Sequence, residues 1–146
     1  MKNSKPMVDT NILVYAHNQD SPYFNQAKFL LINLINKGGF CVTSLILFEF
    51  FSVITNDRKI EEPISSETAL CVIEDIIESQ EIDILHVNDD HNFFQWLRNY
   101  ISTIKRYQIY DASIAYAMYK NEVMELYTNN TKDFKKFDFI EAINPF

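Results

Sequence analysis

The first third of the chain alternates short apolar runs with stretches in which apolar residues recur at helical spacing. The runs Met7–Val8 and Phe40–Thr43 are typical of buried strands, and the first ends at a predicted turn over 9–11. Helical spacing predicts one helix over 22–37 and a second over 45–56. A strand followed by a helix therefore occurs twice.

The rest of the chain continues this alternation. Strands that alternate with helices are joined by crossovers, which make the strands parallel and cover both faces of the sheet with helices. We therefore expect an α/β fold, a three-layer α/β/α sandwich around a central, mainly parallel sheet of four or five strands. The further predicted elements are a helix capped by Ser65 or Ser66, helices over 90–104 and 111–121, and strands over 82–87, 124–127 and 139–140.

Length and composition agree with one globular unit. At 146 residues, 47% of them hydrophobic, the chain can close one core, and we expect a single domain over 1–146. No apolar run approaches the roughly 18 residues of a membrane span, and no signal-peptide pattern opens the chain, so we expect no membrane partner and a cytoplasmic location. Cys41 and Cys71 lie in apolar stretches without zinc-ligand spacing, and we expect both to be buried.

The charge distribution argues against a generalised nucleic-acid-binding surface. The net charge is -7, whereas phosphate neutralisation by Lys and Arg supplies most non-specific affinity for nucleic acid. Residues 103–137 differ, because six positive and four negative side chains give this window a charge of +2 and leave -9 for the rest. Solvated surface charge is one explanation of the window, and a local basic region beside a binding site is the other.

Acidic residues follow the predicted strands at the place where open α/β sheets bind ligands. Asp9 closes the first strand, and Glu49 lies about one helical turn after the second. Asp111 opens the helix that precedes the strand 124–127, and Thr128 follows that strand. Three carboxylates brought together repel one another, and a cation removes the conflict. Oxygen ligands without nearby Cys or His select Mg²⁺ or Mn²⁺ over zinc.

Each carboxylate also has a simpler explanation. Asp9 and Asp111 stand where Asp commonly forms a turn or caps a helix, and both roles are compatible with metal binding. Glu49 interrupts an apolar run over 45–51, where a buried carboxylate is costly unless it is paired or metal-bound. The alternative for Glu49 is a side chain that reaches solvent at the rim of the helix. Glu49 is therefore the most informative of the three.

Four short segments of the sequence follow one another in a recognisable order. They are 7–16 with Asp9, 44–53 with Glu49, 110–115 with Asp111, and 126–134 with Thr128. Together they resemble the motifs of the PIN-domain family, in particular its toxin-type ribonucleases called VapC, over Met7 to about Phe137. The resemblance implies a PIN-like fold and a metal-dependent endoribonuclease, the toxin of a toxin–antitoxin pair. It further implies an RNA substrate, a homodimer and a cognate antitoxin.

The resemblance also implies roles for individual acids and their neighbours. Asp9, Glu49 and Asp111 would be catalytic residues and would hold Mg²⁺ or Mn²⁺, with Asn11 and Thr128 supporting them from behind. The cation would lower the pKa of a bound water that attacks an RNA phosphodiester. The products would carry a 5′-phosphate and a 3′-hydroxyl.

The fourth segment departs from the family pattern at one position. Many members carry an acid where this chain has Asn130. Either the Asn130 carbonyl oxygen, as a catalytic group, or the Asp133 carboxylate, as a metal ligand, would complete the site. Nearby, Lys132, Lys135 and Lys136 would guide RNA toward an otherwise acidic protein.

Two other classes of protein remain open at this point. Haloacid-dehalogenase-like phosphotransferases also place an Asp at a strand end, which would make Asp9 a nucleophile, although their second Asp is replaced here by Asn11. A catalytically inactive PIN-like module that binds RNA or protein is the non-enzymatic alternative, and Asn130 makes it conceivable.

The remaining polar and aromatic candidates have structural explanations. No Ser or Cys nucleophile pattern accompanies His17, His86 or His91, so we expect structural or surface roles for them. Two aromatic groups recur at helical spacing and are predicted to lie in the core or a dimer interface rather than to stack on bases. These groups are Phe48, Phe50 and Phe51, and Phe93, Phe94 and Trp96.

Overall fold

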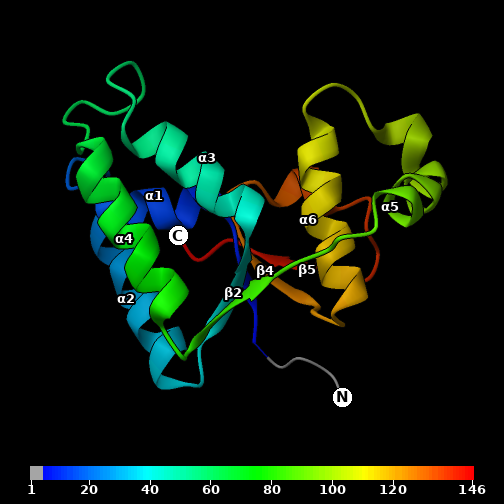
Figure 1. The fold of residues 1–146 in the computed structure, drawn as a ribbon, viewed down its shortest axis with the longest axis horizontal. Helices are drawn as coiled ribbons and strands as arrows, with labels where there is room; N and C mark the ends of the chain where they lie inside the picture. The colour runs from blue at the N-terminus through cyan, green and yellow to red at the C-terminus, as the bar shows by residue number, and fades with distance from the viewer. Residues whose placement is uncertain (1–4) are drawn as a thin grey trace.

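The computed structural model describes residues 5–146, in which strands and helices alternate (Figure 1). The strands of this part of the chain are β1 (Met7–Val8), β2 (Phe40–Thr43), β3 (Ile82–Leu85), β4 (Glu125–Tyr127) and β5 (Glu141–Ile143). Its α-helices are α1 (Thr10–His17), α2 (Phe24–Asn36), α3 (Ser44–Ile54), α4 (Ser66–Glu78), α5 (Asp90–Leu97) and α6 (Gln108–Lys120). Two short 3-10 helices, η1 (Arg98–Thr103) and η2 (Thr131–Phe134), complete it.

A parallel sheet with the strand order β3-β2-β1-β4-β5 organises these elements. Each neighbouring pair of strands is parallel, and Met7 of β1 pairs with Cys41 of β2 on one side and Leu126 of β4 on the other. The chain moves from β1 to β3 in one direction and then builds β4 and β5 on the opposite side of β1. The winding therefore reverses between β1 and β4, which is where open α/β sheets bind ligands.

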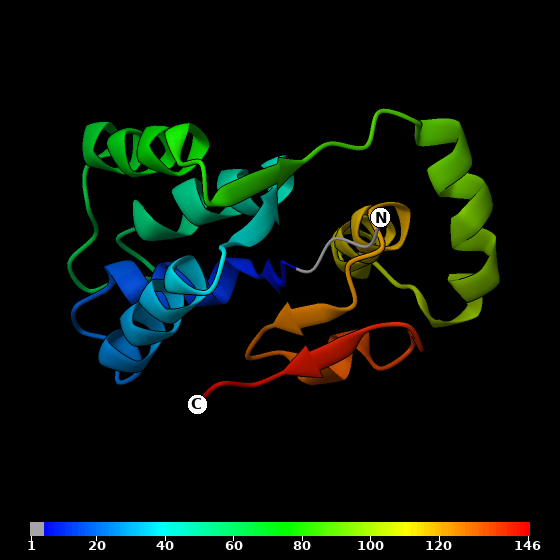
Figure 2. The same cartoon turned by 90° about the horizontal axis from the view of Figure 1, so that it is seen from below.

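Helices cover both faces of the sheet. Figure 2 shows α1 to α4 on one side of the strands and α5 with α6 on the other. The central strands β1 and β2 are buried between these layers, whereas β3, β4 and β5 are partly exposed. The expected three-layer α/β/α sandwich with a parallel central sheet is confirmed, and the sheet has five strands in the part of the chain that the structure describes.

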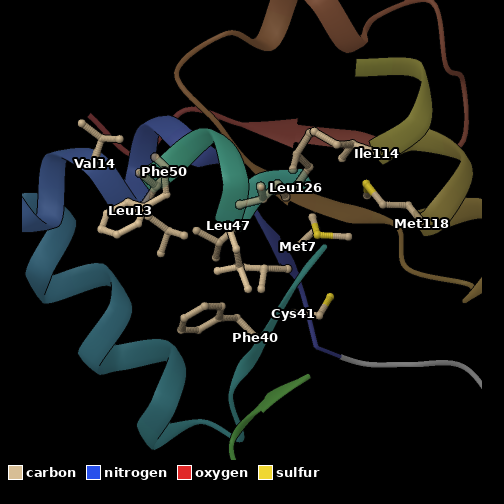
Figure 3. Packing of buried hydrophobic residues seen from close by; sticks show 14 of the residues in the cluster. Met7, Leu13, Val14, Phe40, Cys41, Leu47, Phe50, Ile114, Met118 and Leu126 are labelled. Atoms are coloured by element: carbon tan, nitrogen blue, oxygen red, sulfur yellow. The ribbon is translucent and has the colours of Figure 1, made fainter. Parts of the chain in front are cut away.

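The core lies between the sheet and these helical layers (Figure 3). Met7, Cys41 and Leu126, on three neighbouring strands, are fully buried. Phe50 of α3 and Met118 of α6 are also fully buried, and they come from the two opposite layers. Burial of one large apolar side chain contributes about 2 kcal/mol. The buried state expected for Cys41 is confirmed.

The turn predicted over 9–11 is wrong, whereas the alternative that Asp9 caps a helix is confirmed, because Asp9 is the N-cap of helix α1. The Asp9 side chain accepts a hydrogen bond from the Thr10 backbone N–H at 2.8 Å. Ile12 and Leu13 of α1 are almost completely buried, as are Val14 and Ala16 further along. Because most of its residues are buried, the apolar run of α1 lacks the spacing of an amphipathic helix, and the sequence did not predict a helix there.

Helix α6 begins earlier than predicted, at Gln108, so Asp111 lies in its first turn and does not cap it. Backbone bonds start the helix instead, since the Gln108 N–H donates to the Lys105 carbonyl and the Tyr110 N–H to the Tyr107 carbonyl. The helix predicted over 90–104 also differs, because α5 ends at Leu97 and a 3-10 helix follows.

Two further expectations are wrong. The last strand is Glu141–Ile143 rather than 139–140, because the Phe139 ring packs against Trp96 and Tyr119 instead of entering the sheet. Cys71 is exposed, whereas we expected it to be buried, since its position on α4 lies off the face that buries Ala69 and Ile76.

None of the helices in the described part of the chain is both long enough and apolar enough to span a membrane.

Candidate metal centre

Asp9 lies where β1 ends and α1 begins, and its side chain is tightly held. The residue is buried, with 6% of its surface exposed. Its carboxylate accepts hydrogen bonds from the Thr10 backbone N–H and the Thr128 hydroxyl, both at 2.8 Å, and a longer one of 3.4 Å from the Asn11 amide. Burial raises the pKa of Asp9, and these hydrogen bonds oppose the rise.

Glu49 on α3 is joined to Asp9 through a single residue. The Thr10 hydroxyl donates to the Glu49 carboxylate at 2.9 Å, while the Thr10 backbone N–H donates to Asp9. Glu49 is half-buried, so its helix is neither wholly enclosed nor freely solvated at this point. Burial raises the pKa of Glu49, as does the charge of Asp9. The packing of α1 against α3 thus brings two acids that are distant in sequence to one place.

Asp111 approaches the same place from α6, in the opposite helical layer. Burial raises its pKa to about 7, and the charges of Asp9, Asp133 and Glu49 add to this effect. The charge of Lys136 opposes the rise in the pKa of Asp111. A carboxyl group whose pKa is raised toward neutrality by burial and by neighbouring acids marks a site that favours a proton or a cation.

A cavity of about 360 Å³ connects these acids beyond the carboxyl ends of β1 and β4. A larger hollow of about 450 Å³ lies between α3 and α4, but its lining is almost wholly apolar. We take the 360 Å³ cavity as the candidate functional site, because three carboxylates line it where the winding of the sheet reverses. Its lining residues are Asp9, Thr10, Asn11, Val14, Tyr15, Asn18, Glu49, Val53, Lys59, Ile60, Asp111 and Asn130.

The three carboxylates share this cavity without forming a closed set of ligands. Among the residues that the structure describes, no three His, Cys, Asp or Glu side chains are grouped closely enough to hold a metal ion as they stand. The mutual effects of the acids on the pKa of Asp111 nevertheless show that they are electrostatically close. Binding of one ion by all three would require side-chain movement, and their assignment as ligands stays a prediction.

Asn11 and Thr128, expected to support the acids, form a network behind Asp9. Thr128 is fully buried, and its hydroxyl accepts hydrogen bonds from the Asn130 backbone N–H at 3.0 Å and the Asn11 amide at 3.3 Å. The Asn11 side-chain oxygen accepts from the Asn129 backbone N–H at 3.1 Å. This network joins the ends of β1 and β4 and orients the Asp9 carboxylate.

Asn130 and Asp133, the alternative fourth groups, both lie near the acids but in different ways. Asn130 is exposed and lines the cavity. Asp133, in η2, is half-buried and does not line it, yet its charge raises the pKa of both Asp9 and Asp111. Asn130 therefore borders the cavity directly, whereas Asp133 acts on its acids through its charge.

The lysines expected to guide RNA lie on and beside η2. Lys132 and Lys135 are exposed. Lys136 donates to the Thr103 carbonyl at 3.1 Å and is near enough to Asp111 to lower its pKa. Of these three lysines, Lys136 therefore interacts electrostatically with an acid of the cavity.

The cavity also contains Lys59 and Tyr15, which sequence reasoning did not single out. Neither residue carries a local signal, because Lys59 reaches the site only through the fold of the loop between α3 and α4. Tyr15 is tied to the network by its hydroxyl, which accepts from the Asn129 amide at 3.0 Å.

The histidines lie in structural or surface positions, as predicted, and some of the aromatic residues lie in the core. The His17 ring bonds to the Leu13 carbonyl at 2.8 Å and meets Phe50 edge-on, so it is structural. His86 and His91 are exposed. Phe50 is buried in the core, and Trp96 packs in a cluster of rings that includes Phe137. In contrast, Phe48 and Phe94 are exposed, with 69% and 55% of their surfaces accessible.

A parallel sheet between two helical layers, with an acidic cavity at its winding reversal, defines an α/β protein with a polar ligand site. The family model described as PIN domain matches residues 7–140, and the chain belongs to this family. This assignment replaces the haloacid-dehalogenase-like alternative. Asp9, Glu49 and Asp111 all lie within the matched region.

Relatives and solved structures extend the match over nearly the whole chain. The chain is 26% identical over 138 residues to Ribonuclease VapC24 of Mycobacterium tuberculosis, which covers 94% of each chain. Its fold resembles the crystal structure of VapBC2 from Rickettsia felis bound to a promoter DNA fragment, with a TM-score of 0.65 and 22% identity over 94% of this chain and 96% of the other. It also resembles the crystal structure of Mycobacterium tuberculosis VapC20, a toxin that cleaves the sarcin-ricin loop, with a TM-score of 0.61 and 15% identity over 84% of this chain and 87% of the other.

Proposed function

We propose that this protein is a metal-dependent endoribonuclease and the toxin of a toxin–antitoxin pair. The observation that carries this conclusion is the cavity at the sheet reversal, whose wall brings Asp9, Glu49 and Asp111 together in a PIN domain. Similarity to a VapC ribonuclease over 94% of both chains supports RNA as the substrate.

The acids of the cavity suit a hard divalent cation. Their donors are carboxylate oxygens, which favour Mg²⁺ or Mn²⁺. Asp9, Glu49 and Asp111 would hold the ion, with Asp133 as a further ligand or Asn130 as a neutral group beside it. When bound, the ion would activate water for attack on a phosphodiester and offset charge on the phosphoryl oxygens.

The other residues of the site hold these acids in position. Thr10 bonds to both Asp9 and Glu49, so it fixes their separation. Thr128 and Asn11 orient the Asp9 carboxylate from behind. Asn130 faces the cavity, where its amide can orient water or substrate.

Charge on the molecular surface brings RNA to the site. Lys132, Lys135 and Lys136 lie on and beside η2, and the charge of Lys136 acts on Asp111. These lysines would attract phosphate toward a protein whose net charge is -7. We further propose a cytoplasmic location, a homodimer, and neutralisation by a cognate antitoxin. Solved VapBC assemblies with this fold support the last of these.

The test is cleavage of RNA by purified protein. Wild-type protein and its Asp9→Asn form are incubated with total RNA and Mn²⁺ or Mg²⁺, with or without chelator, and the cleaved ends are mapped. We expect metal-dependent cleavage by the wild type that leaves 5′-phosphate and 3′-hydroxyl ends, and none by Asp9→Asn. Equal cleavage by both proteins, or cleavage that persists in chelator, contradicts the proposal.

A PIN-like binding module without catalysis is the second candidate. It is favoured by the absence of a closed metal-ligand group among the described residues and by Asn130 in place of an acid. This candidate predicts no cleavage with either metal, and no change in RNA binding when Glu49 is replaced by Gln.

A further inference from the structure

We propose that Lys59 is a substrate-binding residue of the acidic cavity, where its ammonium group contacts a phosphate of the RNA backbone. This inference deepens the proposed function and rests on it, because it concerns the same cavity. Lys59 lies outside the four motif segments and outside the lysine group near η2. Lys59 would therefore be a second source of positive charge at the site, independent of the lysines near η2.

The first support is position. Lys59 belongs to the loop between α3 and α4, and it lines the cavity together with Asp9, Glu49 and Asp111. No other Lys or Arg of the described residues lines this cavity. Its neighbour Arg58 is exposed and does not line the cavity, although the two residues are adjacent in sequence.

The second support is that the fold holds the Lys59 backbone in place. The Asn56 carbonyl accepts hydrogen bonds from the backbone N–H groups of Lys59, at 3.1 Å, and Ile60, at 2.9 Å. The Asn56 side chain accepts from the Arg58 backbone N–H at 2.9 Å. Ile60 is buried with 5% of its surface exposed, so it anchors the loop directly after Lys59. The loop thus presents Lys59 from a defined point on the rim.

The third support is that the Lys59 ammonium group forms no ion pair with a described residue of the protein. The ion pairs found in the described part of the chain join Lys5 to Asp83 and Lys120 to Asp89. Lys59 is exposed, and its charge lowers the pKa of Glu49 without a contact within ion-pair distance. A flexible ammonium that faces acids at longer range can reach a ligand between them.

The charge balance of the cavity is compatible with a phosphate ligand once a divalent cation is bound. Three carboxylates alone would repel a polyanion, whereas one divalent cation together with Lys59 makes the formal charge of the lining zero. Lysine binds phosphate as a point charge with three donors and needs no fixed approach angle. Lys59 on the α3 side and Lys136 near Asp111 would then bracket a phosphate backbone that crosses the acids.

The test measures RNA affinity as a function of salt for Lys59→Ala, Lys59→Gln and Lys59→Arg. Arg58→Ala is the matched control on the same loop. Each is made in an Asp9→Asn background, and the probe is a labelled single-stranded RNA of mixed sequence followed by fluorescence anisotropy. Cleavage of the same RNA by wild-type protein with Mn²⁺, and by Lys59→Ala in the otherwise wild-type chain, is measured in parallel.

Loss of one phosphate contact should weaken binding on the order of tenfold and flatten the plot of log affinity against log salt by about 0.7. Lys59→Ala and Lys59→Gln should both show this change, Lys59→Arg should restore most of the affinity, and Arg58→Ala should match the parent. A purely structural role would lower thermal stability without changing the salt slope, and that result overturns the inference.

The two proposals fail in different ways. If wild-type protein cleaves with metal but Lys59→Ala binds and cleaves RNA like wild type, the role of Lys59 is wrong and the nuclease stands. If wild-type protein does not cleave with either metal, the nuclease is wrong. A change in affinity and salt slope in Lys59→Ala would then still support Lys59 as a phosphate contact.

Discussion

The two sides of the acidic cavity are built differently. On the α1 and α3 side, hydrogen bonds from Thr10, Thr128 and Asn11 fix Asp9, and Thr10 also fixes Glu49. On the α6 side, the Asp111 carboxylate has no hydrogen bond or ion pair among the described residues, and burial raises its pKa to about 7 with neighbouring charges adding to the rise.

This difference suggests a division of labour between the two sides. Preorganised ligands lose little entropy when they bind an ion, so Asp9 and Glu49 would form the fixed part of the proposed site. A carboxylate without partners can move toward a cation, so Asp111 forms the adjustable part. Among residues 5–146 no closed ligand set is present, which agrees with one side fixed and one side free.

The largest effect should come from the fixed side. Asp9→Asn keeps the size of the side chain and an acceptor for the Thr10 N–H but removes the negative charge. We expect RNA cleavage to fall by more than about 100-fold, the upper range for loss of a supporting group, because the proposed ligand itself is removed. Cleavage rates with saturating Mn²⁺ measure the effect. Circular dichroism should remain that of the wild type, and cleavage near the wild-type rate would remove Asp9 from the site.

A smaller loss should follow when the support of Asp9 is removed. Thr128→Val replaces a fully buried hydroxyl that donates to Asp9 at 2.8 Å by a methyl group. We expect metal affinity and cleavage to fall by about 10–100-fold. Thr68→Val, at the exposed start of α4, is the matched control and should change neither. If the two valine variants have the same metal affinity, the hydrogen-bond network does not organise the site.

The raised pKa of Asp111 should make the folding stability of the metal-free protein, measured in chelator, depend on pH. Its pKa is about 7 in the folded protein against 3.8 as its ordinary value, so the folded state binds the proton more tightly. The stability that this proton provides is complete below about pH 4 and is lost as the pH rises toward about 7. Without metal, the charged carboxylate is therefore a cost at pH 8.

Asp111→Asn removes that cost. We expect it to raise the melting temperature at pH 8 on the order of 3 °C, with a discount for solvent screening, and to change it less at pH 5. Thermal denaturation of both proteins in chelator at the two pH values provides the comparison. A melting temperature that is lower in the variant at pH 8 would mean that Asp111 has a stabilising partner in solution.

The smallest effects should come from the exposed lysines. Lys132→Ala and Lys135→Ala each remove a charge that has no contact with the cavity, so RNA cleavage at low salt should fall only about two- to threefold. The difference should vanish at high salt because exposed charges are screened. Cleavage rates over a series of salt concentrations test this, and a salt-independent loss would indicate direct contact with the reacting RNA.

The sequence predicted the parallel sheet, the layers and the cavity acids because each depends on local signals. Strand runs such as Phe40–Thr43 are bounded by clear changes in pattern, and a Glu within an apolar helix is conspicuous. Helix α1 was missed because five of its eight residues are buried, so its apolar run lacks the spacing of an amphipathic helix. Lys59 was missed because nothing in its own segment shows that the loop folds back to the end of β1.

The most direct test of the central claim is binding of Mn²⁺, followed by electron paramagnetic resonance of the free ion. Purified wild type, Asp9→Asn and Asp111→Asn are titrated at one pH without RNA. We predict saturable binding by the wild type, loss of that binding in Asp9→Asn, and weaker binding in Asp111→Asn. Identical binding by all three proteins, or no binding by the wild type, would contradict a metal centre built from these acids.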